Sequence, residues 1–276
     1  MNVPAAPQNL DYLGHLARNS ARFAQVLARA PAGMRVPTCP GWDADDLLWH
    51  LAQVQWFWGT IVGNGLRTQA EVESLKRPSR PGRREELAAH FDRASGDLQH
   101  NLSTTSPGTP AWTWSEQQSV GFILRRQAHE ALIHRLDAEL TMGQRTPMDA
   151  DISADGIDEA LGFMGSAVPL RGRFLPEPAM TIQVRTSEQH RSWLVTLGRL
   201  SGTQGDSNQH NEPALQVAAL GFGTPAADEP AAATIDGAAA DLDCLLWNRP
   251  AAGRVQWAGD RVVRGRLEQI IADNGH

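Results

Sequence analysis

The chain has almost no lysine, few cysteines and no long apolar run. Its net charge, its cysteines and its hydropathy each argue against a class of protein. Lys76 is the only lysine among 276 residues, so nearly all of the 25 basic residues are arginine. The 31 acidic residues bring the formal net charge to −6, which gives no electrostatic basis for binding nucleic acid or an anionic membrane. The two cysteines, Cys39 and Cys244, form no local CxxC motif, as expected of a cytoplasmic protein in a reducing compartment.

Membrane and secretion signals are also missing. No segment approaches the roughly 18–20 apolar residues that a membrane-spanning helix needs. The start of the chain, "MNVPAAPQNLDYLGHLARNSARF", lacks the basic region and apolar run of a signal peptide. With 41% hydrophobic and 20% charged residues, the composition is that of a soluble globular protein with no membrane partner.

The first half of the sequence has the apolar spacing of helices. We expect the second helix to begin after an N-cap at Asp43 and to end at the "GNG" of residues 63–65. Four amphipathic helices joined by loops predict a four-helix bundle over residues 1–148. The expected helices lie at about residues 9–30, 43–62, 84–102 and 120–142.

From about residue 149 the pattern changes to strands interleaved with helices. Alternating, β-branched stretches predict strands, and longer amphipathic stretches predict helices. The fold class expected is therefore α+β, with the helical bundle followed by a small α/β domain over residues 149–276. The expected strands are 179–186, 191–200, 213–220, 232–237 and 253–259, and the expected helices are 154–164, 238–248 and 260–273.

The fourth predicted helix carries the densest group of titratable residues, in "RRQAHEALIHRLDAE" (125–139). Glu130 and His134 are four residues apart, so they lie on one helix face about 6 Å apart and could bind one metal. His129 is rotated by about 100° from Glu130 and is not expected to join them. Asp137 follows His134 by three residues and could accept a hydrogen bond from its ring or act as a base.

A third ligand has to come from another helix, and His50 is the strongest candidate. It lies within "DDLLWHLAQVQW", among leucines, where a buried imidazole needs a partner for each ring nitrogen. A metal held by His50, Glu130 and His134 would supply one of these partners. Two histidines and a carboxylate leave a fourth zinc position open, as in catalytic sites.

Structural explanations compete with this metal site. A Glu–His pair four residues apart is common, and His50 could be an ordinary core histidine. The arginines of the fourth helix, Arg125, Arg126 and Arg135, could pair with its acidic residues on a solvated face. The tryptophans near His50 suit core packing or a pocket wall, as do two in the loop before the fourth helix; they are Trp49, Trp56, Trp58, Trp112 and Trp114. Spacing alone leaves a helical bundle with or without a metal.

Two longer segments resemble a known family. "VPTCPGWDADDLLWHLAQVQWFW" and "WTWSEQQSVGFILRRQAHEALIHRLDAE" resemble the mycothiol-dependent maleylpyruvate isomerase family, within the DinB-like superfamily of metal-binding bundles. The C-terminal segments "ADGIDEALGF" and "DLDCLLWNRPAAGRVQWAGDRVV" resemble the small α/β domain of that family. The resemblance therefore covers nearly the whole chain.

The resemblance implies an enzyme with a zinc ion, or another divalent metal, held by His50, Glu130 and His134. It also implies mycothiol, a low-molecular-weight thiol, as cosubstrate and an electrophilic small molecule as substrate. Coordination to zinc would convert the thiol to a thiolate at neutral pH. Arg249, in "LLWNRP", matches a position where the family tends to carry an arginine facing the active site, which implies substrate or thiol binding; a surface or helix C-cap role would be the structural explanation. Cys39 is expected to be a packing residue.

The reaction remains open between two outcomes. An isomerase adds the thiolate to a cis double bond, lets the adduct rotate and releases the thiol, whereas a related transferase leaves the thiol on its product. The segment 201–230 is enlarged or diverged relative to the simple isomerase, which keeps a thiol S-transferase beside maleylpyruvate isomerase proper. A metal-water hydrolase with Asp137 as general base is a third hypothesis, and a non-catalytic regulatory protein that binds metal or ligand is a fourth. Either a monomer or a homodimer is expected.

Overall fold

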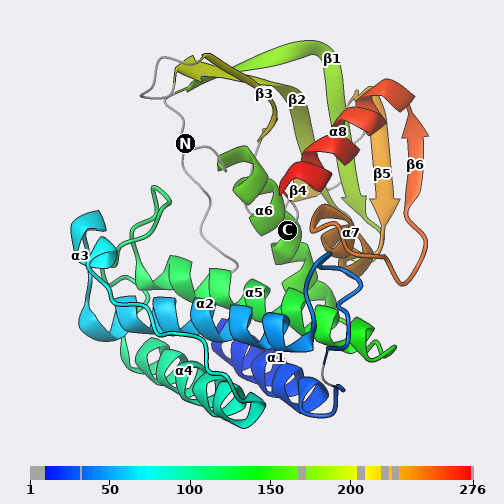
Figure 1. Ribbon diagram of the computed structural model, residues 1–276. Helices are drawn as coiled ribbons and strands as arrows, with labels where there is room; N and C mark the ends of the chain where they lie inside the picture. The colour runs from blue at the N-terminus through cyan, green and yellow to red at the C-terminus, as the bar shows by residue number, and fades with distance from the viewer. Residues whose placement is uncertain are drawn as a thin grey trace. The chain divides into compact units, whose positions relative to one another are not determined.

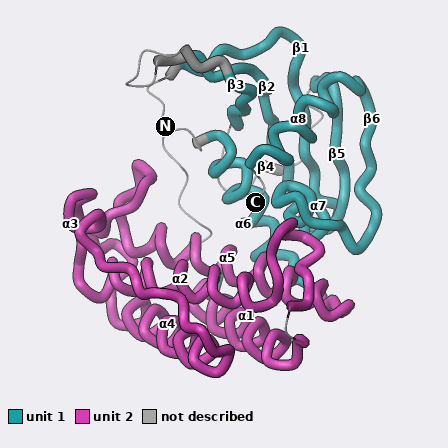
Figure 2. Tube along the Cα trace, in the orientation of Figure 1, with its two compact units in different colours: residues 1–10, 148–276 teal, residues 11–147 magenta. Residues whose placement is uncertain are grey.

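The computed structural model describes residues 10–31, 33–166, 172–203, 209–218, 224–225 and 230–274. The chain divides into a helical unit, Asp11–Pro147, and a second unit whose main part begins at Met148 (Figure 2). Within the described residues, no helix is both long enough and apolar enough to cross a bilayer.

The helical unit contains the four long helices predicted from the sequence (Figure 1). Within it, α1 packs against α5 and α2 packs against α4. A short helix, α3, was not predicted, because five residues carry too little periodicity to reveal a helix. The helices are α1 Tyr12–Leu27, α2 Ala44–Asn64, α3 Gln69–Glu73, α4 Arg84–Thr104 and α5 Val120–Thr141.

The ends of α2 are fixed by local chemistry, as the sequence predicted. Asp43 accepts hydrogen bonds from the backbone N–H groups of Asp45 and Asp46, and the Asp46 carboxylate in turn accepts from the N–H of Asp43. This capping box satisfies backbone donors that have no partner within the helix. At the other end, Gly65 adopts a φ of 62°, the left-handed conformation typical of a glycine C-cap. The capped α2 holds His50 within its second turn.

The core of the bundle consists of two apolar clusters. One cluster gathers side chains from the C-terminal half of α1, the N-terminal half of α2 and the start of α4, and the other gathers those from the opposite ends. Burial of these side chains supplies the main stabilisation of the bundle. The largest buried members of the first cluster are Phe23, Leu27, Leu47, Leu51 and Phe91, and those of the second are Leu16, Trp58, Ile61, Leu98 and Ile123.

Polar side chains lie between the two apolar clusters along each of three helices. They are Ser20 on α1, Gln55 on α2 and His134 on α5, and all three are buried. The Nε2 atom of Gln55 donates to Ser20 Oγ over 2.8 Å. A buried polar group is costly without hydrogen-bond partners. Polar residues between the two apolar clusters therefore indicate a layer of the bundle that serves a function other than core packing.

The second unit is built on one mixed sheet with strand order β3-β2-β1-β5-β6, and β4 pairs with β2. The pair β1 and β5 is parallel and the other pairs are antiparallel. Helices and strands together confirm the predicted α+β class. The elements are α6 Ala150–Ser166, β1 Gly172–Thr186, β2 Arg191–Thr203, β3 Gln209–Val217, β4 Thr224–Pro225, β5 Ala233–Gly237, α7 Ala239–Leu246, β6 Gln256–Gly259 and α8 Arg261–Asn274.

The strand β1 is longer than the sequence predicted. It begins at Gly172 instead of residue 179, and its register against β2 shifts between Pro176 and Thr181. Proline interrupts the usual strand pattern and is confined to edges and irregular positions, so the first half of β1 did not read as a strand. Of the diverged segment 201–230, residues 204–208, 219–223 and 226–229 lie outside the described residues.

One face of the sheet is buried. Alternate residues of β1 and β2 point to this face, among them Ile182, Val184, Trp193 and Val195. The helices α6 and α8 contact the strands, and the indole N–H of Trp193 donates to the Asp158 carboxylate of α6. The sheet and its helices therefore form a core separate from that of the bundle.

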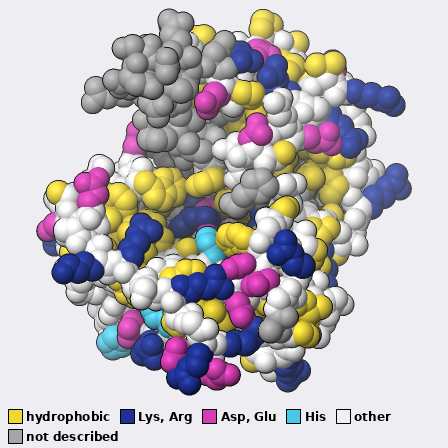
Figure 3. All heavy atoms as spheres, in the orientation of Figure 1, with side chains coloured by type: hydrophobic (Ala, Val, Ile, Leu, Met, Phe, Trp, Pro, Cys, Tyr) yellow, Lys and Arg dark blue, Asp and Glu magenta, His cyan; other side chains and the backbone are white. Residues whose placement is uncertain are grey.

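Charged side chains of both signs lie on the surface of the helical unit (Figure 3). On the face of the helical unit drawn in Figure 3, acidic and basic side chains are intermixed. Among the described surface pairs, Arg83 contacts Glu86 and Arg80 contacts Asp46.

Candidate metal centre

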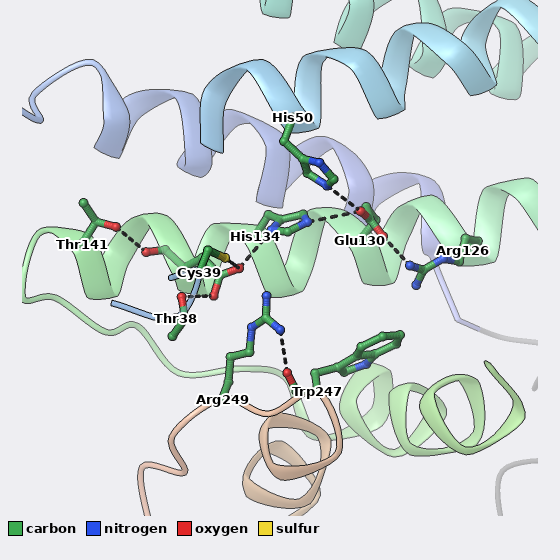
Figure 4. Close-up of polar contacts among 10 residues, drawn as sticks. Thr38, Cys39, His50, Arg126, Glu130, His134, Thr141, Trp247 and Arg249 are labelled. Carbon is green, nitrogen blue, oxygen red and sulfur yellow. Dashed lines mark hydrogen bonds and ion pairs between the residues drawn. The ribbon is translucent and has the colours of Figure 1, made fainter. Parts of the chain in front are cut away.

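Three side chains from two helices converge in the helical unit (Figure 4). His50 extends from α2 toward α5, which contributes Glu130 and His134 from successive turns. The Nε2 atom of His50 lies 3.4 Å from Glu130 Oε1, and the Nε2 atom of His134 lies 3.2 Å from the same oxygen. One ligand atom from each residue lies within 4.8 Å of the other two. The three predicted metal ligands are therefore brought together.

The spacing of these atoms suits a metal ion. The His134–Glu130 separation lies at the upper end of the 2.7–3.2 Å range of N–H···O hydrogen bonds, and the His50–Glu130 separation exceeds it. Tetrahedral zinc with bonds of about 2.0–2.1 Å would separate its ligands by roughly 3.3–3.4 Å. Two imidazole nitrogens and one carboxylate oxygen are also a ligand set that zinc accepts. The residues present therefore fit a zinc ion.

Glu130 is held in the ionised form that a metal ligand requires. Burial alone would raise its pKa, but the Arg126 guanidinium and hydrogen bonds from His134 and His50 outweigh burial and hold the pKa well below the usual range. Arg126 Nη2 lies 2.5 Å from Glu130 Oε2, while the histidines face Oε1. The two oxygens thus have different partners, which leaves Oε1 for a metal.

His134 is oriented from both sides of its ring. Its Nδ1 atom lies 2.9 Å from Asp137 Oδ2, and its Nε2 atom faces Glu130. Burial opposes protonation, but the hydrogen bonds with Asp137 and Glu130 overcome it and raise the pKa of His134 to about 9. The metal-free ring is therefore protonated at neutral pH, and binding of a metal has to release that proton.

Asp137 lies at the nitrogen of His134 that is remote from Glu130. Its carboxylate is buried, and its other oxygen, Oδ1, accepts a hydrogen bond of 2.6 Å from the hydroxyl of Thr38. Cys39 Sγ lies 3.8 Å from Oδ2 (Figure 4). Of the two roles expected for Asp137, this geometry favours the acceptor that orients the ring over a base that contacts a metal-bound group.

His50 forms the more open side of the centre. Its side chain is 33% exposed, against 9% for His134 and 11% for Glu130. The ring of Trp42 lies 4.8 Å from the ring of His50, tilted by 44°. Because the other two ligands are nearly enclosed, a small molecule would approach the centre beside His50.

Comparison with known proteins identifies a family for the helical unit. A family model described as "Mycothiol maleylpyruvate isomerase N-terminal domain" matches residues 13–139. The helical unit belongs to the mycothiol maleylpyruvate isomerase N-terminal domain family. This match confirms the family resemblance predicted from the sequence.

Two solved structures share the fold of the whole chain. They are a mycothiol-dependent maleylpyruvate isomerase and a variant of that enzyme with one histidine replaced by alanine. Each has a TM-score of 0.55 and 13% sequence identity, over 91% of this chain and 93% of the other. At this identity the similarity shows a common fold. No curated protein matches the chain significantly in sequence.

Arg135 and Glu139 of α5 are buried, so the interpretation that these two residues pair on a solvated face is wrong. Arg135 and Glu139 form a buried pair at 3.6 Å, and Glu139 also accepts a hydrogen bond of 2.8 Å from Arg22 of α1. His129 is buried as well, with its ring 6.3 Å from that of Tyr12. It lies outside the group of metal-ligating residues, as its rotation around the helix predicted.

The tryptophans of the mycothiol maleylpyruvate isomerase N-terminal domain divide between several environments. Trp58 is buried in the second apolar cluster and stacks on Trp112 with 6.3 Å between centroids, which is core packing. Trp49 lies beside His90 of α4, with 5.5 Å between their rings. Trp114 is 44% exposed and packs edge-on against Phe122. Trp42, which the sequence did not single out, is the tryptophan whose ring contacts His50.

Arg249 belongs to the second unit. It follows α7, and its Nη1 atom donates to the backbone carbonyl of Trp247 over 2.6 Å (Figure 4). Trp247 is the C-cap residue of α7, so this hydrogen bond favours a helix-capping role. The expected role of Arg249 in substrate or thiol binding stays a prediction.

Sequence reasoning missed the partners that hold the ligands in place. The sequence suggested only that arginines of this helix pair with its acidic residues on a solvated face, and it did not indicate that Arg126 holds an almost enclosed metal ligand. Thr38 was not foreseen at all, because it lies in a loop and carries no periodic signal. The only available signal was its position in the "PTCPGW" segment that carries the family resemblance.

Proposed function

We propose that the protein is a zinc enzyme that uses mycothiol as a nucleophile toward an electrophilic small molecule. The observation that carries this proposal is the convergence of one ligand atom each from His50, Glu130 and His134 within 4.8 Å, with both Nε2 atoms facing Glu130 Oε1. These residues supply three protein ligands and leave a fourth position of a tetrahedral ion for another molecule. Membership of the helical unit in its family supports mycothiol as that molecule.

The metal would supply one chemical effect. A thiol with a free pKa of about 8.5 becomes a thiolate at neutral pH when it is coordinated to zinc. The protein residues prepare the site for it. Arg126 keeps Glu130 ionised, and Asp137 holds the Nδ1 proton of His134 so that Nε2 is free to bind the ion.

The substrate class follows from the nucleophile. A thiolate adds readily to a carbon–carbon double bond activated by a neighbouring carbonyl, and maleylpyruvate is the substrate in the name of the structurally similar isomerase. Release of the thiol after rotation gives an isomerase, and retention gives an S-transferase. The family resemblance suggests Arg249 for binding a carboxylate of the substrate or thiol in addition to its hydrogen bond to Trp247, since arginine pairs with carboxylates in a bidentate manner.

A metal-water hydrolase gains no support from the site. In such an enzyme Asp137 would act as general base, but its carboxylate binds Nδ1 of His134 and the Thr38 hydroxyl. A base has to reach the proton that it removes, directly or through one water. The placement of Asp137 behind the ring therefore favours a role in orientation.

Metal content is the first experiment. The protein is purified, incubated with zinc and analysed by mass spectrometry, beside His50→Ala, Glu130→Ala and His134→Ala. We expect about one zinc per chain in the wild type and loss of zinc in the three variants. His90→Ala is the matched control, because His90 lies on α4 beside Trp49 and outside the centre. Absence of zinc from the folded wild type would reject the proposed function.

Thiol consumption is the second experiment. The zinc-loaded protein is given maleylpyruvate and a panel of activated alkenes and other electrophiles, with and without mycothiol. An isomerase requires mycothiol and leaves its concentration unchanged, whereas a transferase consumes one equivalent per product. Turnover without thiol would favour the hydrolase, and metal binding without turnover would favour a regulatory protein.

A further inference from the structure

One loop is connected to both histidine ligands, to His50 by a direct ring contact and to His134 through the Asp137 carboxylate. This loop, Val36–Trp42, precedes α2 and is closed by its own backbone: Val36 N–H donates to the carbonyl of Trp42 over 3.1 Å, and Trp42 N–H donates to that of Cys39 over 3.0 Å. Gly41 adopts a φ of 94°, a conformation that other residues rarely take. The loop is therefore a defined turn with a fixed shape.

Thr38, near the middle of the loop, is connected to His134 through the Asp137 carboxylate. The Thr38 hydroxyl donates to Asp137 Oδ1 over 2.6 Å, and Asp137 Oδ2 lies 2.9 Å from His134 Nδ1. The Asp137 side chain is completely buried, so its orientation depends on protein partners and not on water. Cys39 Sγ makes a weaker contact with Oδ2 at 3.8 Å.

Trp42, the last residue of the loop, contacts His50 directly. The ring of Trp42 lies 4.8 Å from that of His50. His50 and His134 are themselves 4.8 Å apart between ring centroids, at an angle of 72°. A displacement of the loop would therefore disturb the two ligands at once, His134 through Asp137 and His50 through Trp42.

We propose that Thr38 is a positioning residue of the metal centre. Its hydroxyl fixes the Asp137 carboxylate so that Oδ2 holds the Nδ1 proton of His134, which leaves the Nε2 lone pair directed at the ion. Outer partners of this kind typically change metal affinity by about 10–100-fold when they are removed. This inference rests on the proposed zinc site and extends it to a residue of the preceding loop.

The test compares Thr38→Val with Thr38→Ser. Valine keeps the shape of threonine without the hydroxyl, whereas serine keeps the hydroxyl. Zinc affinity is measured by competition with a chromogenic chelator, and the His134 Nδ1–H proton is followed by NMR in the zinc-loaded protein. We expect Thr38→Val to bind zinc about 10-fold more weakly and to exchange the Nδ1 proton faster with water. Thr38→Ser should restore both properties to near the wild type.

A double-mutant cycle tests whether Thr38 acts through Asp137. In an Asp137→Asn background, Thr38→Val should change zinc affinity less than twofold, because the carboxylate that it orients is gone. Thr38→Ala provides a smaller replacement if the valine variant does not fold. Equal zinc affinity and proton exchange in the valine variant and wild type would overturn the inference, as would equal losses in the valine and serine variants. Absence of zinc from the wild type would instead reject the proposed function.

Discussion

Two buried carboxylates, one in each unit, are driven in opposite directions by their surroundings. Glu130 of α5 faces Arg126, His134 and His50, and these partners hold its pKa well below the usual range despite burial. Asp243 of α7 is equally enclosed, but burial raises its pKa well above the usual range and the nearby Glu159 and Asp155 of α6 raise it further. Among the described residues, neither oxygen of Asp243 has a hydrogen-bond partner.

The comparison shows that burial by itself does not decide the charge of a carboxyl group. Removal from water always favours the neutral form, and the neighbouring charges determine whether this preference is overcome. At Glu130 a cation and two imidazoles overcome it, which produces an ionised metal ligand. At Asp243 like charges reinforce it, which raises the pKa of a carboxyl group in the contact between α6 and α7 well above the usual range.

The largest expected effect is loss of metal from Glu130→Gln. The amide is nearly the same size as the carboxylate but lacks its charge. Zinc affinity should therefore fall by more than about 100-fold, which is the largest effect expected from loss of an outer partner. Asp243→Asn makes the same chemical change in the other unit and should keep about one zinc per chain. Mass spectrometry of the two purified variants measures the difference. Equal zinc contents would contradict the contrast between the two sites.

The second prediction concerns the pH dependence of Asp243→Asn. Because the pKa of Asp243 is raised in the folded protein, folding takes up a proton at pH values above about 4. The free energy of unfolding therefore falls as pH rises toward the folded pKa. The asparagine variant lacks this loss. Its free energy of unfolding should therefore improve relative to the wild type by up to about 1.4 kcal/mol per pH unit.

Urea unfolding of both proteins between pH 4.5 and 7.5 provides the measurement for Asp243. The denaturation midpoints should separate as pH rises, with the variant gaining. Parallel pH profiles would mean that Asp243 is ionised in the folded protein.

The third prediction concerns His134 in the metal-free protein. Its folded pKa of about 9 is raised above the ordinary 6.5. The stabilisation of the folded protein by protonated His134 is therefore complete below pH 6.5 and is lost as pH rises through 9. The loss should be up to about 3 kcal/mol. Thermal unfolding in the presence of a chelator, at pH 6 to 9.5, should show this decline in the wild type and a smaller one in His134→Gln.

Zinc should reverse this trend, because the metal binds the neutral ring. Stabilisation by added zinc should then increase with pH over the same range. A metal-free wild type with the same pH profile as His134→Gln would show that the pKa of His134 is not raised.

The smallest effect is expected at Gly156, where α6 passes Asp243. A Cβ atom at Gly156 would lie 2.6 Å from Asp243 Oδ2, so Gly156→Ala should destabilise the protein by about 1–2 kcal/mol. The control is Gly96→Ala on α4, where nothing lies within 4 Å and alanine should stabilise the helix by up to about 1 kcal/mol.

Combination with Asp243→Ala tests the cause of the Gly156 effect. The double variant should lose less stability than the sum of the two single variants, because the oxygen that the new methyl group meets is gone. Additive losses in urea unfolding would place the cause elsewhere.

Much of the local structure could be predicted from the sequence. The N-cap at Asp43, the end of α2 at Gly65 and the bounds of α5 within one residue follow from patterns that repeat over one or two turns. Strand β1 was found only in part, because Pro176 and Pro178 obscure its alternation. Short-range signals identify regular elements and fail where an element is irregular.

The candidate site divides in the same way. The i, i+4 spacing of Glu130 and His134, and the exclusion of His129 from their face, are properties of any α-helix and needed no tertiary information. His50 could be proposed only as an unexplained polar residue, and the partners Thr38 and Trp42 could not be connected to the ligands. Thr38 meets Asp137 from a segment almost a hundred residues away in the chain.

The sequence by itself determined the long helices, the order of the two units and which side chains of α5 share a face, because bond geometry repeats these relations every few residues. Only the tertiary structure decided which buried carboxyl group has a lowered pKa and which a raised pKa, and where His50 meets Glu130. These outcomes depend on burial and on charges contributed by other elements, and Coulomb interactions across a few ångströms take no account of distance along the chain.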